Sequence, residues 1–209
     1  HATRLARYFP ALQVSAIDLS RTALAYASMK ASAYELSNIQ FSRADILHAG
    51  AKDDHHDVIE CSGVLHHMHN PATGLHALAE RLKPGGVMKI ALYSATARRT
   101  ISRLRTLLAA NRPQQDTAIR LVREALLQQS LPGDWQDIYQ SADFYSLSGC
   151  RDLLFHEQEH VFDVLELPEF LHHAGLQWMG MLPPPGAQAL IDLTGKHCSE
   201  ISVQEWHQL

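Results

Sequence analysis

An apolar run near the start of the chain ends in an acidic residue and a serine: Val14-Ser15-Ala16-Ile17-Asp18-Leu19-Ser20. The run predicts a strand that ends at Asp18, and Ser20 is a plausible N-cap for an alanine-rich helix that reaches about Glu35. Upstream, apolar residues at helical spacing predict another helix, which Pro10 ends. A strand flanked by helices is the building unit of an α/β fold.

The alternation of strands and helices continues downstream. Short strands are predicted at residues 39–41 and 57–61, followed by a helix at residues 71–82. The composition of residues 83–86 (Lys-Pro-Gly-Gly) predicts a turn, and residues 87–93 read as a buried strand. Such an alternation implies a parallel sheet with right-handed crossovers and helices on both faces.

The pattern then becomes helical. Residues 95–129 read as two helices, the second capped by Asp116, and residues 130–145 as a loop. Ser148 is expected to cap a short helix that ends near His156.

The α/β pattern resumes with a helix at residues 167–174, Gly175 as its stop, and a strand at residues 176–181. We therefore expect a partial core, a helical insertion or lid, and a C-terminal part of the core, at residues 1–94, 95–160 and 161–209.

Composition excludes several broad classes of protein. The 209 residues, 46% of them hydrophobic, suffice for one domain or for one domain with an insertion. The net charge of −4 gives no general attraction to nucleic acid or anionic membrane, and no apolar run reaches the roughly 18 residues of a membrane span. The three scattered cysteines argue against a disulfide framework, so a cytoplasmic protein is expected.

A carboxylate at the end of this strand suits an adenosine ribose. It can accept hydrogen bonds from both ribose hydroxyls, at the crevice where open α/β sheets bind ligands. Asp18 occupies that place, but dinucleotide enzymes use the same device and a strand-end aspartate can also be a simple cap.

Five segments, in this order and spacing, resemble the motifs of class I methyltransferases that use S-adenosylmethionine (SAM): Ala16-Ile17-Asp18-Leu19-Ser20, Ala44-Asp45-Ile46, Asp57-Val58-Ile59-Glu60, Gly63-Val64-Leu65-His66-His67 and Leu82-Lys83-Pro84-Gly85-Gly86. The resemblance implies a Rossmann-like parallel sheet with flanking helices, a helical insertion after the fifth strand, and SAM as cofactor. The ribose, the adenine and the methionine part of SAM would be bound by Asp18, Leu19, Ala44, Asp45, Ile46, Cys61, Ser62, Gly63 and Leu65.

A narrower resemblance extends over the whole chain, including Phe144-Tyr145-Ser146 and residues 150–160. It is to bacterial methyltransferase domains that often accompany tetratricopeptide repeats, so such repeats are possible partners. The family's first strand and glycine-rich loop, and its final strand, are missing from this sequence. The fold is therefore expected to be incomplete at both ends, the fragment inactive alone, and the missing first strand placed between those ending at Asp18 and Cys61.

Methyl transfer from a sulfonium needs mainly alignment and desolvation, with a general base only when the acceptor is protonated. The candidates for catalysis are His66 and His67 at the end of a strand, and Glu159 and His160 at the lid. The alternative for His66 and His67 is that one packs beneath the cofactor and the other faces solvent. The alternative for Glu159 and His160 is a local structural network.

The segment His156-Glu157-Gln158-Glu159-His160 matches the HExxH pattern of zinc proteases. The metzincin extension is absent, because Asp163 and Glu166 stand where it needs a glycine and a third histidine. His66, His67 and His69 on a strand-to-loop segment do not all face one way, and no cysteine or carboxylate nearby in the sequence completes a set. No metal is expected.

Seven arginines occupy the predicted insertion: Arg98, Arg99, Arg103, Arg105, Arg112, Arg120 and Arg123. They form either a solvated helical face or a lid that recognises an acidic substrate or partner, and the scarcity of aromatic residues disfavours a nucleic-acid groove. The leading hypothesis is a methyltransferase acting on a protein or small molecule. The alternatives are a non-catalytic methyltransferase-like binding module and a nicotinamide-dependent oxidoreductase, which the Lys-Pro-Gly-Gly turn and the lack of a Tyr-xxx-Lys pair disfavour.

Overall fold

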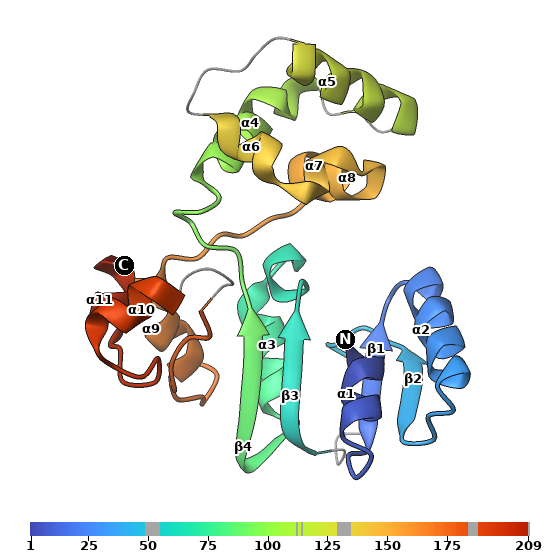
Figure 1. The fold of residues 1–209 in the computed structure, drawn as a ribbon, viewed down its shortest axis with the longest axis vertical. Coiled ribbons are helices and arrows are strands. Elements are labelled where there is room, and N and C mark those ends of the chain that lie inside the picture. The colour runs from blue at the N-terminus through green and yellow to red at the C-terminus, as the bar shows by residue number, and fades with distance from the viewer. Residues whose placement is uncertain (49–54, 112, 114, 129–134, 184–187, 209) are drawn as a thin grey trace. The chain divides into compact units, whose positions relative to one another are not determined.

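The computed structural model describes residues 1–48, 55–111, 113, 115–128, 135–183 and 188–208 (Figure 1). The chain divides into two compact units. Unit 1 comprises residues 1–59 and 76–88, and unit 2 comprises residues 60–75 and 89–209. None of the described helices is long and apolar enough to cross a membrane.

Unit 1 begins with the predicted helix, strand, helix and strand. These are α1 (Ala2–Tyr8), β1 (Val14–Asp18), α2 (Arg21–Ala33) and β2 (Ile39–Arg43). The strands β1 and β2 are parallel, in register from Val14 opposite Ile39 to Asp18 opposite Arg43, and both helices pack on them. Ser20 caps α2 as predicted, since its Oγ accepts a hydrogen bond from the Ala23 N–H at 3.2 Å.

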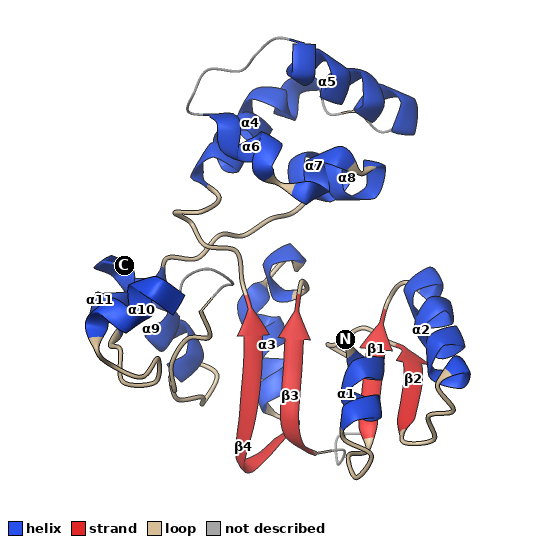
Figure 2. Cartoon of the chain, viewed as in Figure 1, coloured by secondary structure: helices blue, strands red, loops and turns tan. Residues whose placement is uncertain are grey.

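A second two-stranded sheet contains β3 (His56–Ser62) and β4 (Leu82–Ala91), which point the same way (Figure 2). The connection between them includes the 3₁₀ turn η1 (Leu65–His67) and α3 (Pro71–Ala79). In the described part of the chain, β1 and β3 belong to different sheets, as expected if they are not direct neighbours. The prediction that another strand separates them stays a prediction.

Two expectations about the Lys-Pro-Gly-Gly segment were wrong. Residues 83–86 lie inside β4 rather than in a separate turn, and Val87 is 44% exposed rather than buried. The segment is a bend within the strand: Gly85 has a φ of +76°, a conformation that favours glycine. A Cβ on Gly86 would come within 2.9 Å of Leu82 and of the Lys83 carbonyl. The two glycines therefore let the backbone kink without ending the strand.

Unit 2 contains a bundle of helices with its own apolar core. Its elements are α4 (Arg99–Leu108), η2 (Ala109–Asn111), α5 (Asp116–Gln128), α6 (Gln136–Gln140), α7 (Ala142–Tyr145) and α8 (Leu147–Phe155). The buried core consists of Leu104, Ile119, Leu126, Ile138, Phe144, Cys150, Leu153, Leu154 and Phe155.

The loop predicted for residues 130–145 is wrong where the structure describes it, because residues 136–145 form α6 and α7. Ile138 and Phe144 are fully buried in the core, so tertiary packing stabilises helices too short to form by propensity alone. Residues 130–134, with Pro132 and Gly133, lie outside the described part. Asp116 is the first residue of α5, and α8 ends at Phe155, close to the predicted end.

The C-terminal part of unit 2 is joined to the end of β4 by a parallel bridge between Ser94 and Phe162. It then contains η4 (Val164–Glu166), α9 (Leu167–His172), α10 (Gln188–Thr194) and α11 (Val203–Gln208). The helix predicted at residues 167–174 is confirmed, and Gly175 follows it with a φ of +73°.

The strand predicted at residues 176–181 is wrong, because the structure assigns no strand there. The Leu176 N–H donates back to the Leu171 carbonyl at 3.0 Å, which closes α9 rather than starting a ladder. Gly180 has a φ of +137°, outside the range of a regular strand.

Candidate functional site

The cofactor-binding residues predicted in unit 1 lie just after β1 and β2. Asp18 is exposed at the end of β1, and its Oδ1 accepts a hydrogen bond from the Ser20 N–H at 2.7 Å. Leu19 is 61% exposed, and its carbonyl accepts a bond from Arg43 Nε at 3.1 Å. Asp45 accepts from the Leu47 N–H at 2.9 Å. Both carboxylates are thus held by the turn that follows their strand.

The remaining predicted cofactor residues lie in unit 2, at the end of β3. Cys61 is buried, and burial raises the pKa of its thiol. The side chain is therefore uncharged and apolar. Gly63 has a φ of +74°, and nothing lies within 4 Å of where a side chain would project. Leu65 is buried beneath this turn. The turn therefore offers bare backbone to a close ligand.

The four catalytic candidates lie close together in unit 2. The His66 ring stacks on Tyr93 with 3.8 Å between centroids, and His67 meets His66 edge-on at 4.3 Å. The His160 N–H donates a hydrogen bond to the His66 carbonyl at 2.8 Å, which brings His160 and its neighbour Glu159 to the same place. The structure thus unites residues from two distant motifs.

His66 is the most buried polar residue of this group, at 2% exposure. Neither ring nitrogen makes a hydrogen bond within the described part of the chain. Burial, helped by His67 and Arg98 nearby, lowers the pKa of His66 to about 4. His66 is therefore neutral at pH 7.

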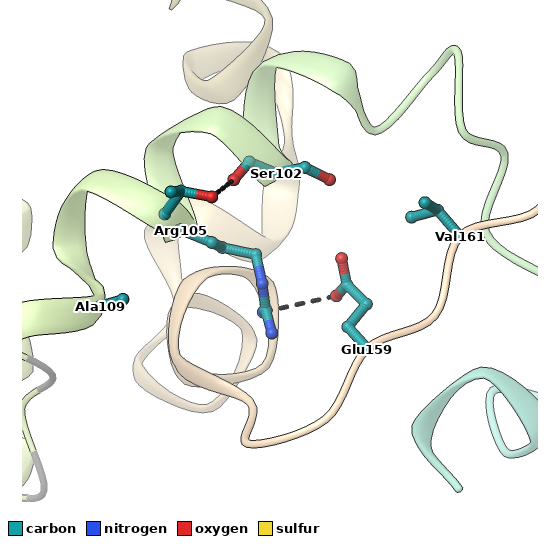
Figure 3. A pocket seen from close by; sticks show the side chains of 6 residues that line it. Ser102, Arg105, Ala109, Glu159 and Val161 are labelled. Carbon is teal, nitrogen blue, oxygen red and sulfur yellow. Dashed lines mark hydrogen bonds and ion pairs between the residues drawn. The ribbon is translucent and has the colours of Figure 1, made fainter. Parts of the chain in front are cut away.

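Glu159 is held by two arginines on the segment leading into α4 and on α4 itself. Its Oε2 lies 3.4 Å from Arg105 and 3.8 Å from Arg98, and its side chain is only 4% exposed. The Arg98 guanidinium lies over the Tyr93 ring at 3.4 Å. Figure 3 shows the Glu159 carboxylate directed toward Arg105.

An open pocket of about 240 Å³ adjoins this ion pair (Figure 3). It is lined by Ser102, Arg105, Thr106, Ala109, Glu159 and Val161. Its walls therefore combine a paired carboxylate and guanidinium with hydroxyl and methyl groups.

Neither hypothesis about the arginines of the insertion, a solvated helical face or a lid for an acidic ligand, accounts for all of them. Arg105 donates to the Leu153 and His156 carbonyls at 3.2 and 2.7 Å, at the C-terminal end of α8. Arg123 donates to the Tyr145 carbonyl at 3.0 Å. These two arginines, with the buried Arg98, join elements of unit 2, whereas Arg112 lies outside the described residues.

Sequence reasoning missed Tyr93, and it named Arg98 and Arg105 among the arginines of the insertion without pairing them with Glu159. No sequence motif marks their contacts, because Glu159 and His66 are distant from them in the sequence. One signal was available: Arg98 and Arg105 are seven residues apart, two turns of a helix, and so share one face.

Residues 1–86 match the family model described as a methyltransferase domain. An uncharacterised protein from Synechococcus sp. is 28% identical over 186 residues, which is 84% of this chain and 44% of that protein. A ubiquinone biosynthesis O-methyltransferase from Azoarcus sp. is 36% identical over 77 residues, which is 36% of this chain and 33% of that enzyme.

Among solved structures, PKMT2 from Rickettsia typhi has a TM-score of 0.67 at 16% identity, covering 96% of this chain and 42% of that one. PKMT2 in complex with AdoHcy has a TM-score of 0.64 at 15% identity, covering 99% and 43%. The chain thus spans less than half the length of these relatives.

The fold is Rossmann-like, with parallel strands and flanking helices. Residues 1–86 of the 209 are similar to a methyltransferase domain. The resemblance of the sequence to class I methyltransferases implies SAM as the cofactor. The exposed Asp18 carboxylate and the open backbone at Gly63 both suit it, the first for ribose hydroxyls and the second for a close approach.

Proposed function

We propose that the protein containing this chain transfers a methyl group from SAM to a protein or small-molecule acceptor. The observation that carries the proposal is the exposed carboxylate of Asp18, fixed at the end of β1 within the segment that matches a methyltransferase domain. SAM supplies a methyl group already activated on a sulfonium. The protein then has to bind the two reactants, align them and exclude water.

The acceptor is proposed to approach the cluster that contains His66, His67, Glu159 and His160. A base there is needed only when the acceptor carries a proton. The low pKa of His66 and its burial make it a weak base at neutral pH, and Glu159 is engaged by Arg98 and Arg105. His67 already contacts Asp152 and the Gln158 carbonyl. We therefore assign His160 to the acceptor side, with Glu159 as a positioning residue.

SAM affinity of the full-length protein, measured by calorimetry, tests the cofactor part. Asp18→Ala should weaken binding about 10- to 150-fold, the equivalent of about 1.5–3 kcal/mol for lost charge-assisted hydrogen bonds. Asp18→Asn is the matched control, which keeps the shape and one acceptor oxygen and should lose less. An unchanged affinity in Asp18→Ala would mean that the site is misplaced.

Transfer of labelled methyl groups from SAM into the proteins and small molecules of a cell extract tests the catalytic part. His160→Ala should lower the rate of transfer while leaving SAM affinity unchanged, as expected for a residue that touches only the acceptor. An unchanged rate would assign His160 a structural role. SAM binding without any transfer by the wild type would instead favour the non-catalytic binding module.

A further inference from the structure

Three side chains from separate motifs converge beside the catalytic candidates in unit 2. His67, Asp152 and His156 each offer one ligand atom, and these atoms all lie within 4.8 Å of one another. His67 ends η1, while Asp152 and His156 are four residues apart on α8 and at its C-cap. The three residues are partly exposed, so an ion can reach them from solvent.

The two imidazoles are oriented by one backbone carbonyl. The Gln158 carbonyl oxygen lies 3.0 Å from His67 Nδ1 and 2.6 Å from His156 Nδ1. A carbonyl only accepts, so His67 carries its proton on Nδ1 and donates it there. The Gln158 N–H also lies 3.3 Å from His156 Nδ1, but the carbonyl at 2.6 Å is the closer partner and requires a proton on that nitrogen. Each Nε2 then has a free electron pair. Histidines that bind metals are held in this way, because the N–H of the other ring nitrogen donates a hydrogen bond to a carbonyl or carboxylate.

The distance to the carboxylate is that of an ion pair and also that of two ligands of one metal ion. His67 Nε2 and Asp152 Oδ1 are 3.6 Å apart, beyond hydrogen-bond range. Two ligands bound tetrahedrally to zinc at about 2.0–2.1 Å are about 3.3 Å apart. The His67 and His156 rings lie face to face, 3.8 Å between centroids and inclined by 31°. Directing all three ligand atoms at one ion therefore requires rotation of at least one imidazole, because stacked rings point their in-plane electron pairs side by side.

We propose that His67, Asp152 and His156 form a binding site for a divalent transition-metal ion such as zinc. Two imidazoles and one carboxylate are a donor set that zinc accepts, and three protein ligands leave a fourth position for water or a small ligand. The site goes beyond the proposed methyl transfer and does not depend on it. It also differs from the HExxH reading, with which it shares only His156. While the ion is bound, neither nitrogen of His67 is available as a base.

Titration of the metal-free full-length protein with Zn²⁺ and Co²⁺ tests the site. We expect one equivalent of tight binding per chain and a visible absorption band of tetrahedral cobalt. His156→Ala and Asp152→Asn should each weaken zinc binding at least about tenfold, as for loss of a metal ligand. Both residues are partly exposed, so both variants should fold. Circular dichroism checks this separately.

Two further variants separate this site from the other histidine arrangements. His160→Ala should leave zinc affinity unchanged, whereas a zinc-protease site would lose its ion. His172→Ala, at the end of α9, should also bind zinc as the wild type does. The proposal is overturned if the wild type binds no zinc, if a folded His156→Ala variant retains it, or if His160→Ala or His172→Ala abolishes it. SAM binding and methyl transfer do not enter these measurements, so failure of one proposal leaves the other standing.

Discussion

Burial of one histidine couples the stability of unit 2 to pH. His66 stacks on Tyr93, and its pKa is lowered to about 4 from an ordinary value near 6.5, chiefly by burial. Below about pH 6.5 the unfolded chain gains a proton on this residue, and the folded chain does not until about pH 4. The unfolded state therefore binds more protons in this window, and the free energy of unfolding falls as the pH falls.

We predict that His66 alone lowers the free energy of unfolding by about 3 kcal/mol between pH 7 and pH 4. All three tryptophans (Trp135, Trp178 and Trp206) belong to unit 2, so their fluorescence during urea unfolding reports its stability. His66→Phe keeps an aromatic ring and removes the titration, so its stability should fall less in acid. Equal acid sensitivity in both proteins would show that His66 does not titrate as described.

The residues of the candidate site differ in how far the sequence predicts them. The position of Asp18 is predictable because ligands of α/β folds bind at the carboxyl ends of parallel strands. Asp18 is exposed at the end of β1, as a ligand-binding residue has to be. Asp152 has no such place: it meets His67 only because α8 folds back beside η1. The expectation that no carboxylate completes a histidine set considered only neighbours in the sequence, and tertiary contacts supply this one.

At the scale of elements, the start of α8 shows how helix caps are misplaced by sequence. Ser146 precedes Leu147 and Ser148 precedes Gly149-Cys150, and each serine suits an N-cap. The structure uses Ser146, whose Oγ accepts a hydrogen bond from the Gly149 N–H at 2.9 Å, whereas Ser148 is exposed inside the helix. Only the backbone geometry distinguishes the two, because a cap has extended dihedral angles and a helical residue does not.

The two serines make a matched pair of variants. Ser146→Ala should destabilise unit 2 by about 1 kcal/mol, because the Gly149 N–H loses its partner at the end of the helix. Ser148→Ala should change stability by less than about 0.5 kcal/mol, since alanine is at least as favourable as serine within a helix. Urea unfolding followed by tryptophan fluorescence measures both. The reverse order of effects would restore Ser148 as the cap.

Element type was predicted best where periodicity and local signals agree. In unit 1, β1 has an apolar run that ends in an aspartate, and α2 begins at the Ser20 cap. Both elements were predicted correctly, as was the short strand β2. The strand expected at residues 176–181 has the apolar pattern alone, and a strand also needs a partner for its backbone groups. The short helices α6 and α7 depend on the burial of Ile138 and Phe144, which propensity does not reveal.

At the scale of the whole molecule, the predicted cofactor residues are divided between the two compact units. Asp18 and Asp45 belong to unit 1, whereas Cys61, Gly63 and Leu65 belong to unit 2. The resemblance to class I methyltransferases assigns both groups to one SAM molecule, so SAM binding should stabilise segments of both units. A ligand that binds only the folded form adds about 2.7 kcal/mol of stability at a concentration one hundred times its Kd.

Hydrogen exchange of the full-length protein with and without SAM can therefore test the shared assignment. SAM should slow exchange of the amides that follow Asp18, among them the Ser20 N–H, and also of those around Gly63. Asp18→Ala should diminish both effects together at a SAM concentration that saturates only the wild type. The amides of α5, which contribute no predicted cofactor residue, are the internal control. Protection confined to one unit would contradict the assignment of both groups to a single cofactor, because a ligand held by both segments has to restrain the backbone of each.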